Sequence, residues 1–209
     1  MENNQPVKPP SQHDMGGSEH ASAGNGVSAS APTGALDEAA IAFAQQVFDC
    51  ARSGDATMLG RLIEKGLPPN LRNDKGDSLV MLASYHGHAD AVKTLLQHGS
   101  DPNLRNDNGQ TPIAGAAFKG FQDVVEALLD EGADVEGASP DGRTALMVAA
   151  MFNRTEMVKL LVARGANPSA VDANGVTAIG AAQRMGATDT PVQLQRLIEE
   201  QNTDSAAPS

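Results

Sequence analysis

Glycines recur at one fixed spacing along most of this chain, and the spacing limits the possible folds more than any other feature. Gly76, Gly109, Gly142 and Gly175 follow one another at intervals of 33 residues (142 − 109 = 33). A constant period of this length is typical of repeat architectures, in which each unit packs only against its neighbours. We therefore expect a stack of similar units in place of one or two conventional domains.

Each unit has the same order of capping, small and apolar positions after its glycine. A Ser or Thr follows the glycine closely, as at Thr111, and a small residue follows at Ala83, Ala116, Ala149 and Ala182. Three units then contain a Val-x-x-Leu-(Leu/Val) motif before a closing glycine. Ser and Thr cap helix N-termini, Gly supplies positive φ at turns, and Ala allows helices to approach closely. The pattern predicts two short helices in each unit.

The two ends of the chain depart from this pattern. Residues 1–34 are rich in Pro, Ser, Gly, Ala and Asn, so we expect a disordered tail, although a docking motif within it is the alternative. An amphipathic helix with Ile41, Val47 and Phe48 follows as a modified first unit. In the last unit about three residues are inserted around 188–191, and no further glycine turn follows. Modified end units are what a stacked array needs at its exposed faces.

Together these features resemble the ankyrin-repeat family. The most faithful unit runs from Asp107 to Asp134 and contains Thr111-Pro112. The resemblance implies an all-α solenoid of paired antiparallel helices with short β-hairpin fingers, over residues 35–201. After the polar end of the last helix, we expect residues 202–209 to form a flexible C-terminal tail. The repeats fall at about 35–73, 74–106, 107–139, 140–172 and 173–201. The histidine usual after Thr-Pro-Leu is absent, which we expect to lower local stability without changing the fold.

The resemblance also implies a concave groove between the fingers and the inner helices, and a role in binding other proteins. The two positions before each inter-helix turn would face this groove; they are Arg52 and Ser53, Tyr85 and His86, Phe118 and Lys119, Met151 and Phe152, and Arg184 and Met185. Three of the six aromatic residues of the chain lie in this row. Large exposed apolar side chains mark interaction surfaces, so we predict binding here. The alternative is that these rings pack on the neighbouring repeat.

Charge gives the groove a second predicted property. The chain has a net charge of −11, which makes nucleic acid an unsuitable partner. Basic residues nevertheless lie on or beside the predicted fingers at Lys75, Arg105 and Arg143, and Gln110 is a further position that the repeat pattern leaves variable. We expect a locally basic, aromatic groove on an acidic body. The alternative is cancellation by acidic residues on the same fingers, at Asp74, Asp77, Asp107 and Asp141.

Catalytic and metal-binding patterns are not visible in the sequence. The five histidines have no partners at ligand spacing, and no nucleophile elbow, phosphate loop or dinucleotide fingerprint is present. We therefore expect no enzymatic activity, no metal and no cofactor. The single cysteine, Cys50, falls at a small core position and fits a reducing cytoplasm. No stretch is apolar enough to predict a membrane span, and no secretory signal is recognisable.

Two functional hypotheses follow. The first is a cytoplasmic, monomeric, non-enzymatic module that binds a partner protein through the groove. The second is an inhibitor, immunity or chaperone-like regulator that masks a specific enzyme or a basic protein through its acidic surface. Binding through surface charge weakens steeply with salt, whereas binding by aromatic anchors changes little.

Overall fold

The structure is a computed structural model that describes residues 33–205; the predicted N-terminal tail lies outside the described residues except for its last two positions. The described part of the chain contains ten α-helices. Their bounds are α1 (Thr33–Ser53), α2 (Ala56–Glu64), α3 (Leu79–His86), α4 (Ala89–Gln97), α5 (Pro112–Lys119), α6 (Gln122–Asp130), α7 (Ala145–Met151), α8 (Thr155–Ala163), α9 (Ala178–Arg184) and α10 (Thr190–Ser205).

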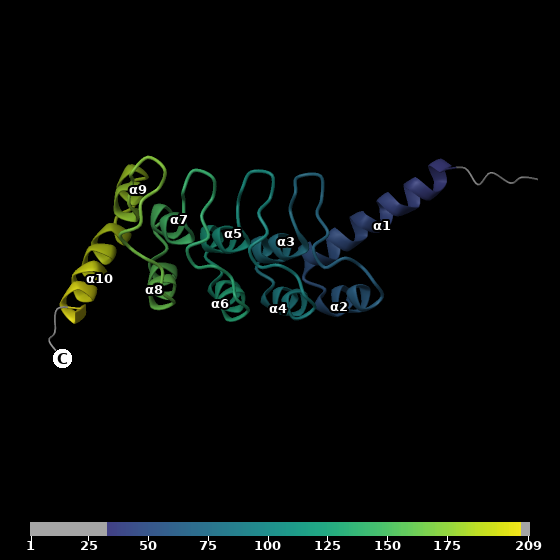
Figure 1. Cartoon of the computed structure of the whole chain (residues 1–209), viewed down its shortest axis with the longest axis horizontal. Helices are drawn as coiled ribbons and strands as arrows, with labels where there is room; N and C mark the ends of the chain where they lie inside the picture. Colours follow the sequence, from purple (N-terminus) through teal and green to yellow (C-terminus); the bar gives the residue numbers. More distant parts are fainter. Residues whose placement is uncertain (1–32, 206–209) are drawn as a thin grey trace, which may run out of the picture.

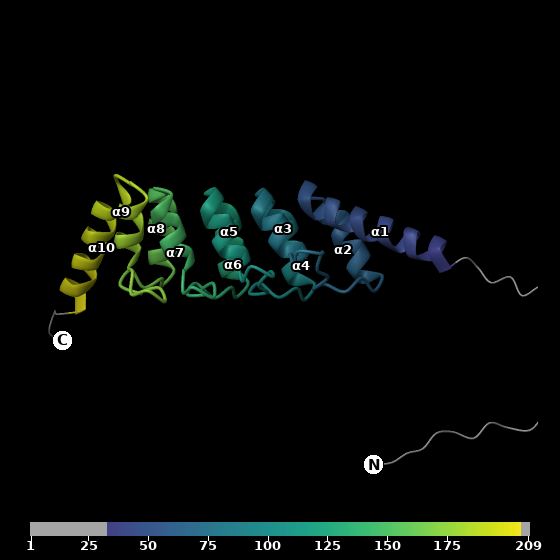
Figure 2. The same ribbon diagram turned by 90° about the horizontal axis from the view of Figure 1, so that it is seen from above.

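The helices form two rows. Helices α1, α3, α5, α7 and α9 pack side by side in an inner row, and α2, α4, α6 and α8 form an outer row (Figure 1). Loops project beyond the inner row as fingers (Figures 1 and 2). There are four fingers among the described residues, and they are numbered from second to fifth after the repeats that they open. Each is closed by a backbone hydrogen bond, such as Asn106 N–H to the Gln110 carbonyl at 3.1 Å in the third finger. The predicted solenoid of paired helices is confirmed. Within the described residues, 33–205, its fingers contain isolated β-bridges in place of the predicted short β-hairpins.

Helix boundaries follow from the capping residues. Ser78, Thr111, Thr144 and Thr177 each accept a hydrogen bond from a backbone N–H in the first turn of the inner helix that they precede. This satisfies a donor that the helix itself leaves without a partner. The inter-helix turn needs positive φ, which Gly87 and Gly120 adopt at 83° and 87°. Asn153 takes the same place in the fourth repeat with φ of 54°.

The core is built from small and branched aliphatic residues. The four alanines at the predicted small positions, which include Ala116 and Ala149, are 0% exposed, and so are Leu95, Leu128 and Leu161 of the outer row. Small side chains on the inner helices let adjacent repeats approach closely. The chain can therefore form a continuous core with only 3% aromatic residues.

The first helix extends past the end of the array. Helix α1 has 21 residues, and its C-terminal half buries Val47, Phe48 and Ala51 against α2 and α3. Its N-terminal half runs away from the neighbouring helices (Figure 1). As a result, Ile41 is 58% exposed and Phe43 is 47% exposed. The helical spacing placed Ile41 on the apolar face that it shares with Val47, but among residues 33–205 no second element covers that part of the face.

The last helix closes the opposite end. Helix α8 begins at Thr155, but α10 begins at Thr190, two residues later than one 33-residue period would place it. Pro191 lies in the first turn of α10. The insertion predicted around residues 188–191 thus falls at the start of this helix. Leu194 is fully buried where α10 packs against α9, α8 and α7. Helix α10 continues to Ser205, past residue 201.

Candidate functional site

A groove of about 790 Å³ lies between the fingers and the inner helices of the second, third and fourth repeats. One wall comes from α3, α5 and α7, and the other from three successive fingers. The helical wall is formed by Met81, Leu82, Tyr85, Ala114, Gly115, Phe118, Val148, Met151 and Phe152. The finger wall is formed by Lys75, Asp77, Asn106, Asn108, Gln110, Ser139, Pro140, Asp141 and Arg143. An apolar wall thus faces a polar one.

The aromatic side chains of the helical wall are partly exposed and partly packed on one another. Tyr85 is 41% exposed and Phe152 is 40% exposed. Phe118 packs edge-to-face on Phe152, with ring centroids 4.6 Å apart. The Lys119 ammonium lies 4.4 Å from the centre of the Tyr85 ring, within the range of a cation–π interaction. The rings therefore make the neighbour contacts of the packing alternative and still leave apolar surface open to the groove.

Two residues with unusually small side chains line the groove at α5. Ala114 and Gly115 occupy the positions at which α3 has Met81 and Leu82, one 33-residue period earlier. Helix α7 has Met147 and Val148 at the same positions. Sequence reasoning that looked for large residues missed these two small ones. Comparing the repeats position by position would have found them, because Gly115 is the only glycine in the column it shares with Leu82, Val148 and Ala181.

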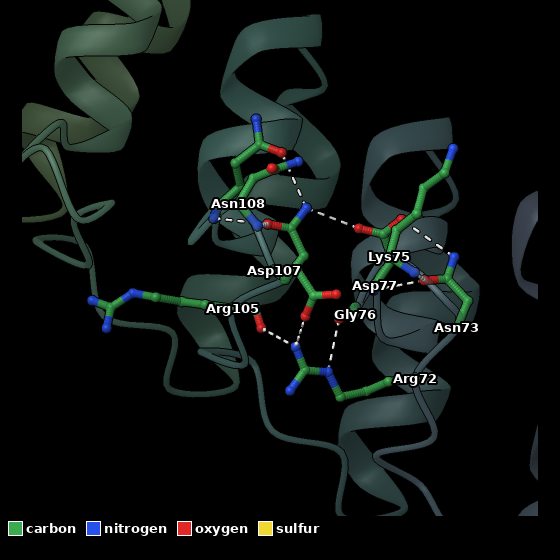
Figure 3. Close-up of polar contacts among 10 residues, drawn as sticks. Arg72, Asn73, Lys75, Gly76, Asp77, Arg105, Asp107 and Asn108 are labelled. Atoms are coloured by element: carbon green, nitrogen blue, oxygen red, sulfur yellow. Dashed lines mark hydrogen bonds and ion pairs between the residues drawn. The ribbon is translucent and has the colours of Figure 1, made fainter.

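Hydrogen bonds between side chains organise the finger wall. The Asn106 amide nitrogen donates to Asp77 Oδ1 at 2.9 Å and to Gln110 Oε1 at 3.0 Å. The Asn106 Oδ1 accepts from the backbone N–H groups of Asn108 and Gln110. Asn73 makes equivalent bonds within the preceding finger, to the N–H groups of Lys75 and Asp77 (Figure 3). These asparagines hold the fingers in fixed conformations and link the second finger to the third.

Arg72 adds a second link between these two fingers. Its guanidinium donates to the carbonyl oxygens of Gly76 and Arg105, at 2.8 and 2.9 Å, and pairs with Asp107 at 3.2 Å (Figure 3). Arg105 stands one period after Arg72, but its side chain points away from this cluster (Figure 3). Pro140 occupies the position at which a counterpart of Asp107 would stand. Arg105 accordingly has no salt bridge within the described chain.

Pro140 also removes a backbone hydrogen bond. The N–H of Asp107 donates to the Lys75 carbonyl at 3.1 Å, which joins the second and third fingers. The N–H of Ala173 donates to the Asp141 carbonyl at 3.0 Å, which joins the fourth and fifth. The corresponding donor between the third and fourth fingers would be residue 140, and proline has no N–H. Within residues 33–205, no hydrogen bond joins the finger at 106–110 to the finger at 139–143.

Two of the four charged side chains that line the groove pair with each other. Arg143 pairs with Asp141 at 3.1 Å, and the Ser139 hydroxyl donates to the same carboxylate. The Ser139 hydrogen bond, with a further contribution from Arg143, lowers the pKa of Asp141 below its usual value. Lys75 differs, since its ammonium has no salt bridge in the described part of the chain. The groove lining thus contains two basic and two acidic side chains, so the cancellation expected as the alternative holds there and the groove is not basic overall.

The structure brings together seven of the twelve residues predicted to bind a partner. The residues that line the groove are Lys75, Tyr85, Gln110, Phe118, Arg143, Met151 and Phe152. The other five lie outside it: Arg105, His86, Lys119, Arg184 and Met185. Arg105 lies apart because its side chain leaves the finger on the side away from the Arg72 cluster (Figure 3). Arg184 and Met185 belong to the fifth repeat, beyond the end of the groove.

Titratable groups near the groove do not form a reactive cluster. Partial burial, and then the neighbouring His88, Arg52 and Lys119, lower the pKa of His86, so its imidazole is neutral at pH 7. Partial burial, and then two nearby aspartates, raise the pKa of Cys50, which keeps it a thiol. The position of Cys50 in the repeat predicted a fully buried thiol. In the structure Cys50 is only half-buried and packs beside the core. Across residues 33–205, no three His, Cys, Asp or Glu side chains are grouped as a metal site would need.

Stacked helix pairs, projecting fingers and a groove between them define this chain as a repeat solenoid protein. A model of three ankyrin repeats matches residues 47–137, and a single ankyrin-repeat model matches residues 141–173. The chain belongs to the ankyrin-repeat family, as the sequence pattern predicted. Ankyrin repeats are generally protein–protein interaction modules without catalytic activity.

One curated relative shares part of this sequence. An ankyrin repeat protein of Pseudomonas aeruginosa is 58% identical to this chain over 62 residues. The match covers 30% of this chain and 36% of that protein. It therefore supports the repeat architecture and leaves most of both chains unmatched. The helices of the described residues include none that is both long and apolar enough to cross a membrane.

Proposed function

We propose that this chain is a non-enzymatic module that binds another protein through the groove between its fingers and inner helices. The observation that carries this proposal is the groove itself, in which exposed Tyr85 and Phe152 face a wall of polar finger side chains. Rigid aromatic anchors beside adaptable polar groups are typical of protein-binding surfaces. The module acts in the cytoplasm as a monomer, a setting that fits its single free cysteine.

The test removes the rings and asks whether binding is lost while the fold persists. The variant replaces Tyr85, Phe118 and Phe152 by Ala, and capture of host proteins by the immobilised chain is compared with the wild type. We expect the specific partner to be lost from the variant, while circular dichroism still shows full helical content. Truncating a central aromatic anchor at an interface typically costs about 2 kcal/mol or more of binding free energy.

A control variant separates groove binding from general surface stickiness. Met58, Val171 and Val192 are 39%, 56% and 54% exposed and lie outside the groove. Replacing all three by Ala removes exposed apolar surface of a similar kind and is expected to leave capture unchanged. Equal capture by the aromatic variant and the wild type would exclude the groove as the binding site. Unfolding of the aromatic variant would mean that the three rings are mainly structural.

The regulatory alternative makes a different prediction about salt. Acidic residues gather on the outer helices, for example Asp90 in α4, Asp123 in α6 and Glu156 in α8. A partner masked by this acidic surface would be released as ionic strength rises, because salt screens interactions between exposed charges. A partner anchored by the aromatic groove would remain bound. Capture at low and at high salt distinguishes the two modes.

A further inference from the structure

The apolar stripe of α1 that packs into the core continues past the end of the array. Ala51, Val47, Ala44 and Ala40 follow one another at intervals of four, three and four residues, so they lie on one side of the helix. Val47 and Ala51 are fully buried, Ala44 is half-buried and Ala40 is exposed. The stripe is therefore covered at one end and uncovered at the other, where α1 runs on beyond α2 and α3 (Figures 1 and 2).

Two large side chains border the exposed end of this stripe. Ile41 comes one residue after Ala40, and Phe43 comes one residue before Ala44. Because successive residues of a helix are about 100° apart, the two large residues lie on opposite sides of the stripe. They are 58% and 47% exposed. Alanine carries only a methyl group, so the surface is low along its centre and raised at both edges, a shape that fits one helix laid along α1.

The projecting half of α1 remains amphipathic although this chain does not cover it. Its opposite side has Glu38, Gln45 and Gln46, which are all exposed. A helix with one apolar and one polar side is typically packed on its apolar side. Exposed apolar surface bordered by polar residues marks an interaction site. We therefore expect another molecule to cover the stripe.

Charge indicates what kind of helix would cover it. No Lys or Arg occurs between Lys8 and Arg52, whereas Asp37 and Glu38 stand at the exposed end of the stripe. Neither acidic residue lies in the first turn of α1, where the helix dipole would favour it. Arg52 pairs with Asp49 at 2.8 Å, and Glu38 has no salt bridge among the described residues. The exposed end of α1 is thus acidic, and a basic partner is complementary to it.

Neither the rest of the chain nor a second copy supplies this complement. Residues 1–32 contain four large apolar residues, and none of them is three or four positions from another, as one side of a helix requires: Met1, Val7, Met15 and Val27. A second copy would bring an α1 with the same acidic end and a further net charge of −11, which repels its like. The occupant is accordingly a different protein.

We propose that the N-terminal half of α1 is a docking surface for one amphipathic helix of a partner protein. The apolar side of that helix packs on Ala40 and Ala44, between Ile41 and Phe43, and Lys or Arg residues beside its apolar side face the acidic end of α1. No residue of α1 lines the groove. This inference therefore goes beyond the proposed function and does not depend on it.

The test compares the binding of helical peptides to the full chain and to matched variants. A phage library displays peptides of about 20 residues, long enough to form a helix, with apolar residues along one side and Lys, Glu or Gln at random beside them. Peptides are selected on the full chain after depletion on Ile41→Gln/Phe43→Gln. This variant removes both bordering side chains and keeps a good helix former at each position, so circular dichroism is expected to show unchanged helical content.

Fluorescence anisotropy then measures the affinity of the enriched peptides. We expect them to carry Lys in preference to Glu beside the apolar side. Ile41→Gln/Phe43→Gln should weaken them about tenfold or more, as the loss of buried anchors does. The control Val171→Gln/Val192→Gln removes two side chains that are 56% and 54% exposed elsewhere on the molecule, and it should leave the affinity unchanged.

Two charge variants separate local complementarity from general attraction to an acidic protein. Asp37→Asn/Glu38→Gln and Glu199→Gln/Glu200→Gln remove equal charge from α1 and from α10, at opposite ends of the array. The α1 variant should weaken the peptides roughly two- to fivefold at low salt, as the loss of exposed ion pairs does, and the α10 variant much less. Equal weakening would show that the peptides respond only to net charge and would overturn the assigned partner chemistry.

Other outcomes overturn the proposal. A selection that enriches no peptide after depletion on Ile41→Gln/Phe43→Gln would exclude a docking surface on α1. Self-association of the wild type in sedimentation, abolished by the same variant, would make a second copy the occupant. Slow amide exchange in the N-terminal half of α1 of the free chain would mean that the chain itself covers the stripe. Loss of the peptides on replacing Tyr85, Phe118 and Phe152 by Ala would place them in the groove.

Discussion

Single residues in the fingers show how the repeat is adapted locally. Asp141 follows Pro140 in the fourth finger and is held by the Ser139 hydroxyl and the Arg143 guanidinium. Both contacts favour the carboxylate over the carboxylic acid, which is why the pKa of Asp141 is lowered. The folded-state pKa thus lies below the unfolded-state pKa. Ionised Asp141 stabilises the fold at higher pH, and this contribution is lost as the pH falls through the folded-state pKa.

Ser139→Ala is predicted to raise the pKa of Asp141 towards its ordinary value, because the Ser139 hydrogen bond is the largest cause of the shift. Arg143→Gln should raise the pKa less, since the guanidinium contributes less. The effect on overall stability should be small, because the Asp141 side chain is 46% exposed and its ion pair is screened. An NMR titration of the Asp141 carboxyl carbon in the three proteins measures the shifts. A larger rise in the Arg143 variant would contradict this order.

At the scale of elements, the start of α10 depends on a side chain from the preceding repeat. The Asn153 Oδ1 accepts from the N–H groups of Asp189 and Thr190, at 3.0 and 3.1 Å, and its amide donates to Asp189 Oδ2 at 2.8 Å. The first N–H groups of a helix have no partner within the helix. Asn153 therefore caps α10 from another repeat and also adopts the positive φ that glycine adopts in the other turns.

Asn153→Gly is predicted to destabilise the C-terminal end by about 1 kcal/mol, since the lost hydrogen bonds outweigh the relief of positive φ. Asn153→Ala loses the same bonds and gains no relief, so it should be less stable than the glycine variant by roughly another 1 kcal/mol. Chemical denaturation of the three proteins gives the order. A glycine variant as stable as the wild type would mean that the side-chain bonds contribute nothing.

The elements could be predicted from the sequence largely because the repeat supplies several independent signals. Thr111 gave the start of an inner helix, Gly120 its end, and the alanine column the faces in contact. The exposure of Ile41 could not be predicted in this way, because helical periodicity shows which residues share a face and not whether another element covers that face.

The site was only partly predictable for a similar reason. Tyr85 and Phe118 were visible as large residues. The small residues Ala114 and Gly115 stand out only when the repeats are compared position by position, and the direction of the Arg105 side chain depends on contacts between fingers.

At the scale of the whole molecule, the array is a row of units in which each stabilises the next. The terminal units have one neighbour fewer, so the buried contacts of α10 matter for the entire C-terminal end. Leu194 is fully buried there, whereas Val192 on the same helix is 54% exposed. Alanine is a better helix former than either residue, so a loss of stability on replacing Leu194 by alanine reports lost packing and not lost helix propensity.

Leu194→Ala is predicted to cost about 2–5 kcal/mol, as the loss of a fully buried leucine does. The loss should be local: amide hydrogens of α9 and α10 should exchange faster, while those of α3 and α5 remain protected. Val192→Ala, the control, should leave exchange unchanged apart from fraying at the helix start. Uniformly faster exchange along the whole chain would show that the array unfolds as one cooperative unit and that its ends are not independent.

Pro140 gives the whole array a mechanical property. The fingers before it and the fingers after it are each held together by backbone hydrogen bonds, whereas the boundary at Pro140 lacks one. Pro140 itself lines the groove, so the weakest link between neighbouring fingers lies in the wall of the binding surface. We expect the finger wall to yield at this boundary before it yields elsewhere, because fewer hydrogen bonds have to break there. The width of the groove would then be adjusted at one place, while the packing of the inner helices is unchanged.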